Sequence, residues 1–340
     1  MSKKKSVTIF GGLGYVGDSL IELLKDVYDV TVIDPNWFDN FYKFKNVRYL
    51  PKSTFDFKSI NTDFCIYLAA VSNDPMGANF SNHTYLVNEY EAIRIAKLCK
   101  SSQKEVRFIL ASSCSVYGCA GDYAKVETDQ VQPITDYAKS KINAELGLKK
   151  VAGNNLKVIC LRFATACGVS RATRLDLVLN DFVITALTTG RIDILSDGMP
   201  WRPFINVKDM ARSMKYCLSA SLENSFEVFN VGSKIFTFRI KELAERISEL
   251  TNSKISIAEK NPLDSRSYTV DFTKFQSWYK EQWPLYLLED TVEELSNFYF
   301  KTIEKYGNSH FYNFRNSSQY CRLNLLKQKN SELNTKLFEL

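Results

Sequence analysis

The chain has 340 residues, of which 45% are hydrophobic and 24% charged, so it is long enough for one large globular domain or two unequal ones. The net charge of +6 is spread along the sequence and its one compact basic run is a lysine cluster at residues 3–5, so we expect no nucleic-acid partner. Neither a stretch of about 18 apolar residues nor the apolar core of a secretory signal is visible, so we expect no membrane partner and a cytoplasmic location. The eight cysteines form no CxxC pair, and we expect buried free thiols and no metal site.

The first half of the chain alternates short apolar strands with amphipathic helices, which indicates a parallel sheet covered on both faces. The helices have apolar residues at the three- and four-residue spacing of one helical face. We therefore predict an α/β fold, a Rossmann-type doubly wound parallel sheet with a smaller α/β C-terminal lobe. Strands are predicted at residues 6–10, 29–33, 47–50, 63–69, 106–111 and 157–161, and helices at 15–25, 86–101 and 135–152.

The alternation ends near residue 168, which divides the chain into three parts. The first domain is predicted to span residues 1–167, with a further strand and helix returning to it near 205–232. Residues 168–304 are expected to form mainly the smaller lobe. Residues 305–340 are polar with a weak helical pattern, and we expect a peripheral tail there.

Three glycines, Gly11, Gly14 and Gly17, lie directly after the first predicted strand and open the first helix. In a dinucleotide-binding turn the first permits a tight turn, the second lets the backbone approach a diphosphate and the third lets the helix pack on the strand. Asp34 ends the next strand, where a carboxylate accepts hydrogen bonds from both ribose hydroxyls and favours NAD over NADP. The alternatives are a glycine-rich turn without a ligand and a turn carboxylate before Pro35.

Tyr137 and Lys141 lie four residues apart on the helix predicted at 135–152, and therefore on one face of it. With 18 tyrosines in the chain, about 1.6 such Tyr-Lys pairs are expected by chance, so the neighbouring residues decide. The strand at 106–111 turns polar at its carboxyl end near Ser113, where a parallel sheet places its ligands. A close ammonium could stabilise a tyrosine phenolate as a base beside this hydroxyl. The alternative is a surface Tyr and Lys beside a structural serine cluster.

Together these motifs resemble the extended short-chain dehydrogenase/reductases, in particular the NAD-dependent nucleotide-sugar epimerase and dehydratase branch. The resemblance covers roughly residues 6–300, including the run 202–209 and Trp283-Pro284. It implies that the first domain binds NAD and that the smaller lobe binds a nucleoside-diphosphate sugar. The catalytic residues it implies are Ser113, Tyr137 and Lys141. The cofactor-binding residues it implies are Gly11, Gly14, Tyr15, Val16, Gly17, Asp34, Asp56, Phe57, Leu68, Ala69, Ala70, Asn88, Ser112, Tyr137, Lys141 and Phe163.

Arginines and polar residues around the second lobe match family positions that contact the substrate. A guanidinium fork suits the oxygens of a diphosphate, as implied for Arg202 and Arg266. For Arg266 the alternative is a surface ion pair with Asp264. Asn73 follows the fourth strand and would face the sugar, and a plain turn there is equally compatible. The substrate-binding residues we expect are Ser72, Asn73, Ser115, Thr165, Arg174, Asn180, Arg202 and Arg266.

The residues after Ser113 separate reaction types within the resemblance. Sugar 4,6-dehydratases have an acidic pair there, and GDP-sugar 3,5-epimerases have a cysteine two residues after the serine. This chain has Cys114 and Ser115, and we expect Cys114 to pack into the wall. The remaining chemistry is oxidation at sugar C4 by Tyr137 and NAD, which predicts a 4-epimerase if the hydride returns to the other face. If the keto sugar is released, the chain is a C4-dehydrogenase or, in reverse, a 4-ketoreductase.

Two stretches depart from the 4-epimerase pattern. Residues 162–165 lack the family's phosphate-contacting asparagine. Residues 168–182 resemble the UDP-glucose enzymes less than they resemble a subgroup that serves bacterial surface polysaccharides, some of whose members oxidise C4. A rival class is an NAD-binding regulator without turnover, against which the retained Ser113 and Tyr137 argue. A reductase of an unrelated small ketone would not need Arg202. Family members often dimerise through helices of the 86–101 and 135–152 type, so we expect a homodimer.

Overall fold

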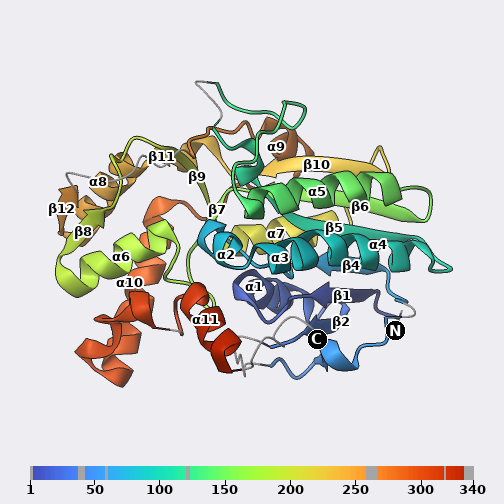
Figure 1. Ribbon diagram of the computed structural model, residues 1–340, viewed down its shortest axis with the longest axis horizontal. Helices are drawn as coiled ribbons and strands as arrows, with labels where there is room; N and C mark the ends of the chain where they lie inside the picture. Colours follow the sequence, from blue (N-terminus) through green and yellow to red (C-terminus); the bar gives the residue numbers. More distant parts are fainter. Residues whose placement is uncertain are drawn as a thin grey trace.

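The computed structural model describes residues 3–36, 43–57, 60–119, 123–257, 266–317 and 319–332. Its central element is a seven-stranded parallel sheet in the order β10-β6-β5-β4-β1-β2-β3 (Figure 1). This order is that of a doubly wound sheet, so the predicted fold class is confirmed. The strands are β1 Ser6–Phe10, β2 Asp29–Asp34, β3 Val47–Pro51, β4 Phe64–Tyr67, β5 Val106–Ser113, β6 Leu156–Phe163 and β10 Phe226–Val231.

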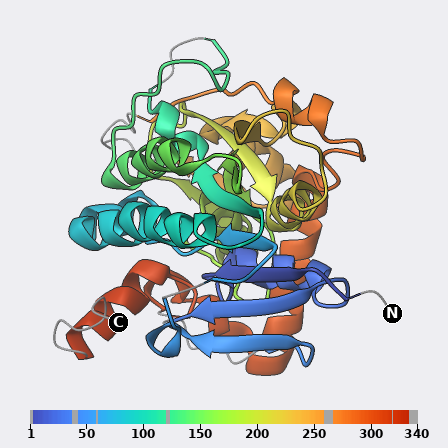
Figure 2. The same cartoon turned by 90° about the vertical axis from the view of Figure 1, so that its right-hand side faces the viewer.

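The strands of this sheet are apolar on both sides because helices cover both faces. In β1, Val7 and Ile9 pack in one hydrophobic cluster and Phe10 packs in the other. Helices α1 and α7 cover the first face, and α4 and α5 cover the second, where Figure 2 shows the cyan and green helices side by side. The helices of this domain are α1 Tyr15–Leu24, α2 Asp74–Asn79, α3 Ser81–Tyr85, a π-helical stretch Leu86–Glu91, α4 Ala92–Lys100, α5 Asp136–Val151 and α7 Val207–Cys217.

The second lobe has its own small sheets and its own core. Strand β9 pairs with β7 in parallel and with β11 in antiparallel direction, and β8 pairs with β12. Helices α6, α8 and α10 pack around a separate apolar cluster that includes Leu179, Ile247 and Leu295. The elements are β7 Thr165–Cys167, α6 Val178–Thr189, β8 Arg191–Ile194, β9 Trp201–Asn206, β11 Thr237–Arg239, α8 Ile240–Thr251, β12 Lys254–Ile257 and α10 Leu288–Tyr306. Helix α9, Thr273–Trp278, packs instead against β10 of the large sheet.

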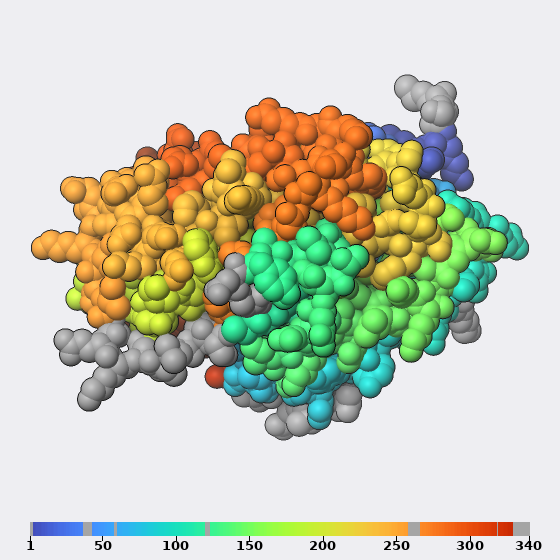
Figure 3. All heavy atoms as spheres, turned by 90° about the horizontal axis from the view of Figure 1, so that it is seen from above, coloured from blue at the N-terminus to red at the C-terminus, as the bar shows by residue number. Residues whose placement is uncertain are grey.

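The chain passes between the two lobes more than once. After β9 it returns to the first domain, where α7 packs on α1 and β10 extends the large sheet beside β6. Seen from above in Figure 3, yellow-green and orange residues of the second lobe occupy one end of the molecule, against the green residues of the first domain. The short 3-10 helices are Lys52–Thr54, Cys114–Tyr117, Lys234–Phe236, Asn308–Phe311 and Phe314–Asn316.

The C-terminal segment, for which we expected a peripheral position, contacts both lobes. Phe311 and Phe314 are buried in a cluster with Tyr299 of α10, and Leu326 is buried near Met76 of α2. The last helix, α11 Arg322–Glu332, packs against α2 (Figure 1). Among the described residues, no helix has the length and apolarity needed to cross a membrane.

Candidate functional site

A cavity of about 980 Å³ lies at the carboxyl ends of the parallel strands and extends into the second lobe. Residues that follow or end β1, β2, β4, β5 and β6 line its first half. Because the strands are parallel, these ends meet at one edge of the sheet, where doubly wound folds bind their ligands. Arginines of the second lobe and of the C-terminal segment line the other parts.

The glycine turn between β1 and α1 forms one wall of this cavity. Gly11 has a φ of +79°, and a Cβ there would lie 2.4 Å from the backbone nitrogen of Ala69. A Cβ on Gly17 would lie 2.3 Å from the carbonyl oxygen of Gly12, so α1 can approach the turn only without a side chain. At Gly14 the nearest atom to such a Cβ is 3.6 Å away, and the residue faces the cavity. The turn therefore leaves backbone and open space where a diphosphate would lie at the N-terminus of α1.

Asp34 is the acidic residue at the end of β2. Its two carboxylate oxygens accept hydrogen bonds from the backbone N–H groups of Leu13, at 3.0 Å, and of Asn36, at 2.7 Å. Burial raises the pKa of Asp34, and these N–H groups oppose the increase. The carboxylate is thus fixed at the cavity wall beside the glycine turn, which fits the adenosine ribose of a dinucleotide.

Ser113, Tyr137 and Lys141 line the cavity together. Ser113 ends β5, and its hydroxyl accepts a hydrogen bond from the backbone N–H of Ser115 at 3.2 Å. Tyr137 lies in the first turn of α5, whose N-cap is Thr135. One turn further, the Lys141 ammonium donates to the carbonyl oxygen of Ala111 at 2.8 Å and lies 5.7 Å from the centre of the Tyr137 ring.

The titration of these groups is shifted by their surroundings. Burial raises the pKa of Tyr137, the nearby Asp74 raises it further, and a hydrogen bond with Ser113 opposes the increase. Burial lowers the pKa of Lys141 to about 8, although Glu145 acts in the opposite direction. Perturbed groups of this kind concentrate at functional sites, so Tyr137 and Lys141, with Ser113 beside them as the third member of the trio, are candidates for the chemical centre of the cavity.

Hydrogen bonds among buried polar residues fix the positions of the elements that carry the trio. Glu145 accepts hydrogen bonds from the Ser112 hydroxyl and from Arg162, whose Nη2 lies 2.7 Å from the carboxylate. Asn88 accepts from the backbone N–H of Val71 at 2.9 Å and donates to the Ser140 hydroxyl at 3.0 Å. These bonds tie the loop after β4 and the strand β5 to α5, so they fix the relative positions of the trio.

The loop after β4 lies beside α5, where Asp74 accepts a hydrogen bond from the Thr135 hydroxyl, and it contributes Ser72, Asn73 and Asp74 to the cavity wall. Arg174 forms a two-pronged ion pair with Asp176 at 2.8 and 2.9 Å and donates to the Ser72 hydroxyl at 2.9 Å. The Asn73 side chain caps α2 from a backbone φ of +108°. Arg266 pairs with Asp74 across the cavity. The alternative partner considered for Arg266, Asp264, lies outside the described residues.

Arg202 enters the cavity from β9 in the second lobe. It is buried, donates to the backbone carbonyl oxygens of Trp201 and Arg266, and lies over the Tyr268 ring at 5.4 Å. Ser115 also faces the cavity, and its hydroxyl oxygen is buried without a hydrogen-bond partner among the described residues. A buried polar atom of this kind is expected to meet a ligand group.

The other expected residues divide into those that line the cavity and those that do not. Asn180 does not line it, because its amide is saturated by Tyr15, Gly168 and the backbone of Arg174 in the interior. Asn88 is equally saturated. Asp56 and Phe57 also lie off the cavity, and the Phe57 ring stacks with Arg94 at 4.3 Å. The expected residues that line the cavity are Gly11, Gly14, Tyr15, Val16, Gly17, Asp34, Leu68, Ala69, Ala70, Ser72, Asn73, Ser112, Ser113, Ser115, Tyr137, Lys141, Phe163, Thr165, Arg174, Arg202 and Arg266.

Several lining residues were not predicted. Asp74 and Asp176 lie next to predicted site residues in the sequence, but their ion pairs with Arg266 and Arg174 depend on the three-dimensional fold. Arg315 and Arg322 come from the C-terminal segment, which has no sequence pattern that points to a ligand. Cys114 is buried outside the cavity, donates to the carbonyl oxygen of Arg162 and has a raised pKa because of burial, so it packs into the wall as expected.

Comparison with known proteins adds independent information. A model of the NAD dependent epimerase/dehydratase family matches residues 7–232. The chain is 25% identical over 329 residues to the UDP-glucose 4-epimerase of Mycoplasma genitalium, covering 87% of this chain and 96% of that protein. It is 26% identical over 286 residues to UDP-glucuronic acid decarboxylase 4 of Arabidopsis thaliana, covering 79% of this chain and 62% of that protein.

A solved structure supports the fold. The UDP-N-acetylglucosamine 4-epimerase from Methanobrevibacter ruminantium M1, in complex with UDP-N-acetylmuramic acid, superposes with a TM-score of 0.75 at 23% identity, covering 87% of this chain and 99% of that one. At this level of identity the likeness concerns the fold alone.

Proposed function

The chain belongs to the NAD-dependent epimerase/dehydratase family, and from this premise we propose that it is a nucleotide-sugar 4-epimerase that acts through Tyr137, Ser113 and Lys141. The observation that carries the proposal is the position of these residues on one wall of a cavity between the glycine turn and Arg202. A dinucleotide on the glycine turn and a nucleoside diphosphate at the arginine would both extend toward this wall. The sugar and the nicotinamide then meet beside Tyr137.

The described residues fit NAD at the first end of the cavity. The open space at Gly14, the N-terminus of α1 and the Asp34 carboxylate suit a diphosphate and an adenosine ribose. The Lys141 ammonium suits the second ribose. When bound, NAD supplies reversible acceptance of a hydride from a sugar carbon.

Tyr137 is the proposed base. Its phenolate takes the proton of the C4 hydroxyl, and the Ser113 hydroxyl donates a hydrogen bond to the oxygen that becomes a carbonyl. The charge of Arg174 opposes the effect of burial on the Tyr137 pKa, and the Lys141 ammonium, 5.7 Å from the ring centre, would add to it. When the sugar presents its other face, Tyr137 returns the proton and the C4 centre is inverted.

Other reactions implied by the family resemblance use an acidic pair or a cysteine directly after the serine of the trio, and this chain does not supply such a group at those positions. The two residues after Ser113 are Cys114, which is buried and bonded to a backbone carbonyl, and Ser115, which has only a hydroxyl. Proton transfer at sugar C3, C5 or C6 requires an additional side chain that can donate or accept a proton, and neither Cys114 nor Ser115 is suited to this. This supports chemistry at C4 alone.

Turnover of a substrate panel tests the proposal. UDP-, GDP- and dTDP-sugars are incubated with the protein and followed by proton NMR, together with absorbance at 340 nm. UDP-sugars are tested first because the curated relatives named above act on them. We expect a 4-epimer without growth of NADH absorbance. A stoichiometric rise of NADH with a free keto sugar would instead support a C4-dehydrogenase, and loss of water or carbon dioxide would overturn the proposal.

A further inference from the structure

Two ion pairs between an arginine and an aspartate line the cavity beside the trio. Arg266 pairs with Asp74, and Arg174 pairs with Asp176 at 2.8 Å. The aspartate side chains are only 19% and 12% exposed, so both carboxylates lie largely out of water. The proposed function assigns the cofactor to the glycine turn and the diphosphate to Arg202, and it gives no role to either aspartate.

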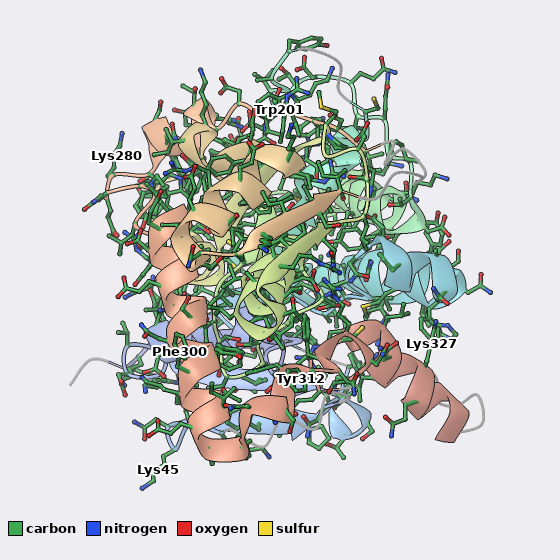
Figure 4. All side chains as sticks on the ribbon, turned by 90° about the vertical axis from the view of Figure 1, so that its left-hand side faces the viewer. Lys45, Trp201, Lys280, Phe300, Tyr312 and Lys327 are labelled. Carbon is green, nitrogen blue, oxygen red and sulfur yellow. The ribbon has the colours of Figure 1, made fainter. Side chains whose placement is uncertain are left out.

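Contacts with β9 place the first pair next to the diphosphate end of the cavity. Strand β9 begins at Trp201, which Figure 4 labels, and its second residue is Arg202. The guanidinium of Arg202 donates to the carbonyl oxygen of Arg266. The hydroxyl of the next residue, Ser267, accepts a hydrogen bond from the backbone N–H of Trp201 at 3.1 Å. Arg266 is therefore bonded directly to the residue that would hold the diphosphate.

Contacts of α2 with α5 place Asp74 next to the trio. The carboxylate oxygen of Asp74 that does not bind Arg266 accepts a hydrogen bond from the Thr135 hydroxyl at 2.5 Å. Thr135 is the N-cap of α5, and Tyr137 is two residues further. A Cβ on Gly77 of α2 would lie 3.1 Å from the backbone nitrogen of Tyr137, so the two helices are in close contact there. The first pair thus lies between the diphosphate end and Tyr137, where the sugar would lie.

The second pair is held on the loop that leads to Asp74. Nε and Nη2 of Arg174 donate to the two carboxylate oxygens of Asp176, and Nη1 donates to the Ser72 hydroxyl at 2.9 Å. All three nitrogens of this guanidinium therefore have a partner. Asp176 also accepts a hydrogen bond from the Asn73 amide at 3.4 Å. Burial acts to raise the pKa of Asp176, but the Arg174 charge outweighs burial and the pKa is lowered, so the carboxylate is ionised.

These charges favour a sugar that has none. Each arginine is neutralised by its own aspartate, so the two pairs offer a substrate no net positive charge. The carboxylate of a uronic acid is attached to C5, next to C4. With C4 at Tyr137, this carboxylate would lie beside Asp74, and two like charges in a partly buried site repel each other. Sugar hydroxyls instead donate charge-assisted hydrogen bonds to carboxylates.

We propose that the sugar moiety of the substrate is uncharged, and that Asp74 and Asp176 accept hydrogen bonds from its hydroxyls and exclude uronic acids. The proposal names the substrate class of the site already described. It rests on the proposed function, because that function places sugar C4 at Tyr137. Its test is a comparison of binding, which does not require turnover.

Nucleotide sugars that differ only in the oxidation of C6 provide this comparison. Protein saturated with NAD is titrated calorimetrically with UDP-glucose and UDP-glucuronic acid, and likewise with GDP-mannose and GDP-mannuronic acid. In the pair whose nucleotide the protein accepts, we expect the uncharged sugar to bind at least about 10-fold more tightly than the uronic acid. Because both members of a pair share a nucleotide, the ratio of their affinities reports on the sugar alone.

Asp74→Asn is the complementary test, since it keeps an acceptor for Thr135 and removes the negative charge. It should lower the ratio at least about fivefold, because the uncharged sugar loses a charge-assisted hydrogen bond and the uronic acid loses a repulsion. Glu289→Gln is the matched control. Glu289 also pairs with an arginine, Arg246 at 2.9 Å, but it is exposed and does not line the cavity. Its ratio should stay within about twofold of wild type.

Two results overturn the inference and leave the proposed 4-epimerisation standing. One is a wild-type ratio below about 10-fold, which decides the matter even if Asp74→Asn does not fold. The other is a folded Asp74→Asn protein whose ratio lies within about twofold of wild type. A protein that prefers the uncharged sugar but forms no 4-epimer would overturn the proposed function alone. Absence of binding in both pairs would overturn the function and the inference together.

Discussion

Tyr137 lies in a place that is unfavourable for a phenolate. Burial and Asp74 both raise its pKa, and Lys141 directs its ammonium to a backbone carbonyl rather than to the phenol oxygen. In the proposed reaction the phenolate would depend on the positive charge that NAD and Lys141 bring to the Tyr137 ring. Base catalysis would then be conditional on a loaded site.

Removal of the Tyr137 hydroxyl tests its role as the base. Tyr137→Phe should reduce turnover by about 10²- to 10⁴-fold, the usual contribution of a positioned acid or base, with unchanged NAD retention. Turnover is measured by NMR on the substrate that the panel identifies. Tyr90→Phe is the control, because Tyr90 is 62% exposed. Wild-type turnover by Tyr137→Phe would show that another group transfers the proton.

The lowered pKa of Lys141 predicts a pH dependence of cofactor binding. Below a pH of about 8 the side chain is charged, and it loses its proton as the pH rises through that value. An ammonium forms stronger hydrogen bonds with ribose hydroxyls than a neutral amine does, so NAD affinity should fall roughly tenfold between pH 7 and 9.5. Calorimetry across this range measures it, with Lys141→Met as the variant that should be weak and insensitive to pH. An equal slope in both proteins would contradict the assignment.

At the scale of single residues, the sequence predicted best what depends on a local pattern. The spacing of Tyr137 and Lys141 on a helix, read together with Ser113 at a strand end, predicted a shared site, and all three residues line the cavity. Asn180 has the right chemistry and lies in the right segment, but its amide is turned inward and saturated. A sequence does not tell the direction of a side chain in an irregular segment, and for the same reason the pairing of Arg266 with Asp74 was not predicted.

At the scale of elements, the glycine turn joins β1 to α1 through glycines with different functions. Gly17 is required by packing, because a Cβ there would meet the backbone of Gly12. Gly14 has ordinary φ and ψ values of −86° and −177° and room for a methyl group in the unliganded protein. Its lack of a side chain matters only when a ligand approaches.

Substitution of the two glycines by alanine should separate stability from binding. Gly17→Ala should lower the free energy of unfolding by about 1–3 kcal/mol, because the clash is with backbone that cannot move aside. Gly14→Ala should cost less than about 1 kcal/mol in stability as a change of N-cap, and weaken NAD at least about 10-fold. Thermal unfolding and calorimetric titration measure both effects. A Gly14→Ala protein with wild-type affinity would place the diphosphate elsewhere.

The predicted elements agree with the structure where periodicity is strong. The six predicted strands coincide with β1 to β6 within a few residues, because buried parallel strands are continuous apolar runs. The helix predicted at 86–101 begins with a π-helical stretch, Leu86–Glu91, which periodicity alone does not reveal. The contacts of the C-terminal segment with both lobes were not predicted, because they are made by single residues, such as Leu326 and Arg315, separated by polar sequence.

At the scale of the whole molecule, the cavity has two ends that belong to different lobes. The glycine turn and Asp34 belong to the large sheet, and Arg202 belongs to β9 of the second lobe. A ligand at either end should stabilise the fold in proportion to its own binding. The division between a cofactor end and a nucleotide end can therefore be tested with one variant.

Arg202→Ala should remove one of two stabilising ligands and spare the other. Wild-type protein should show a higher midpoint of thermal unfolding, Tm, with NAD and a further increase with UDP, GDP or dTDP. In Arg202→Ala the increase with NAD should remain and the increase with the nucleoside diphosphate should fall by half or more. If both increases fall together, the two ends of the cavity are not independent.

The central claim is that a hydride leaves sugar C4 and returns to it within one closed site. A nucleotide sugar that carries deuterium at C4, chosen from the panel for turnover, tests this most directly when the product is examined by NMR and mass spectrometry. We predict a 4-epimer that retains its deuterium at C4, with no labelled NADH in solution. Loss of the deuterium from the sugar, together with its appearance in free NADH, would contradict the account.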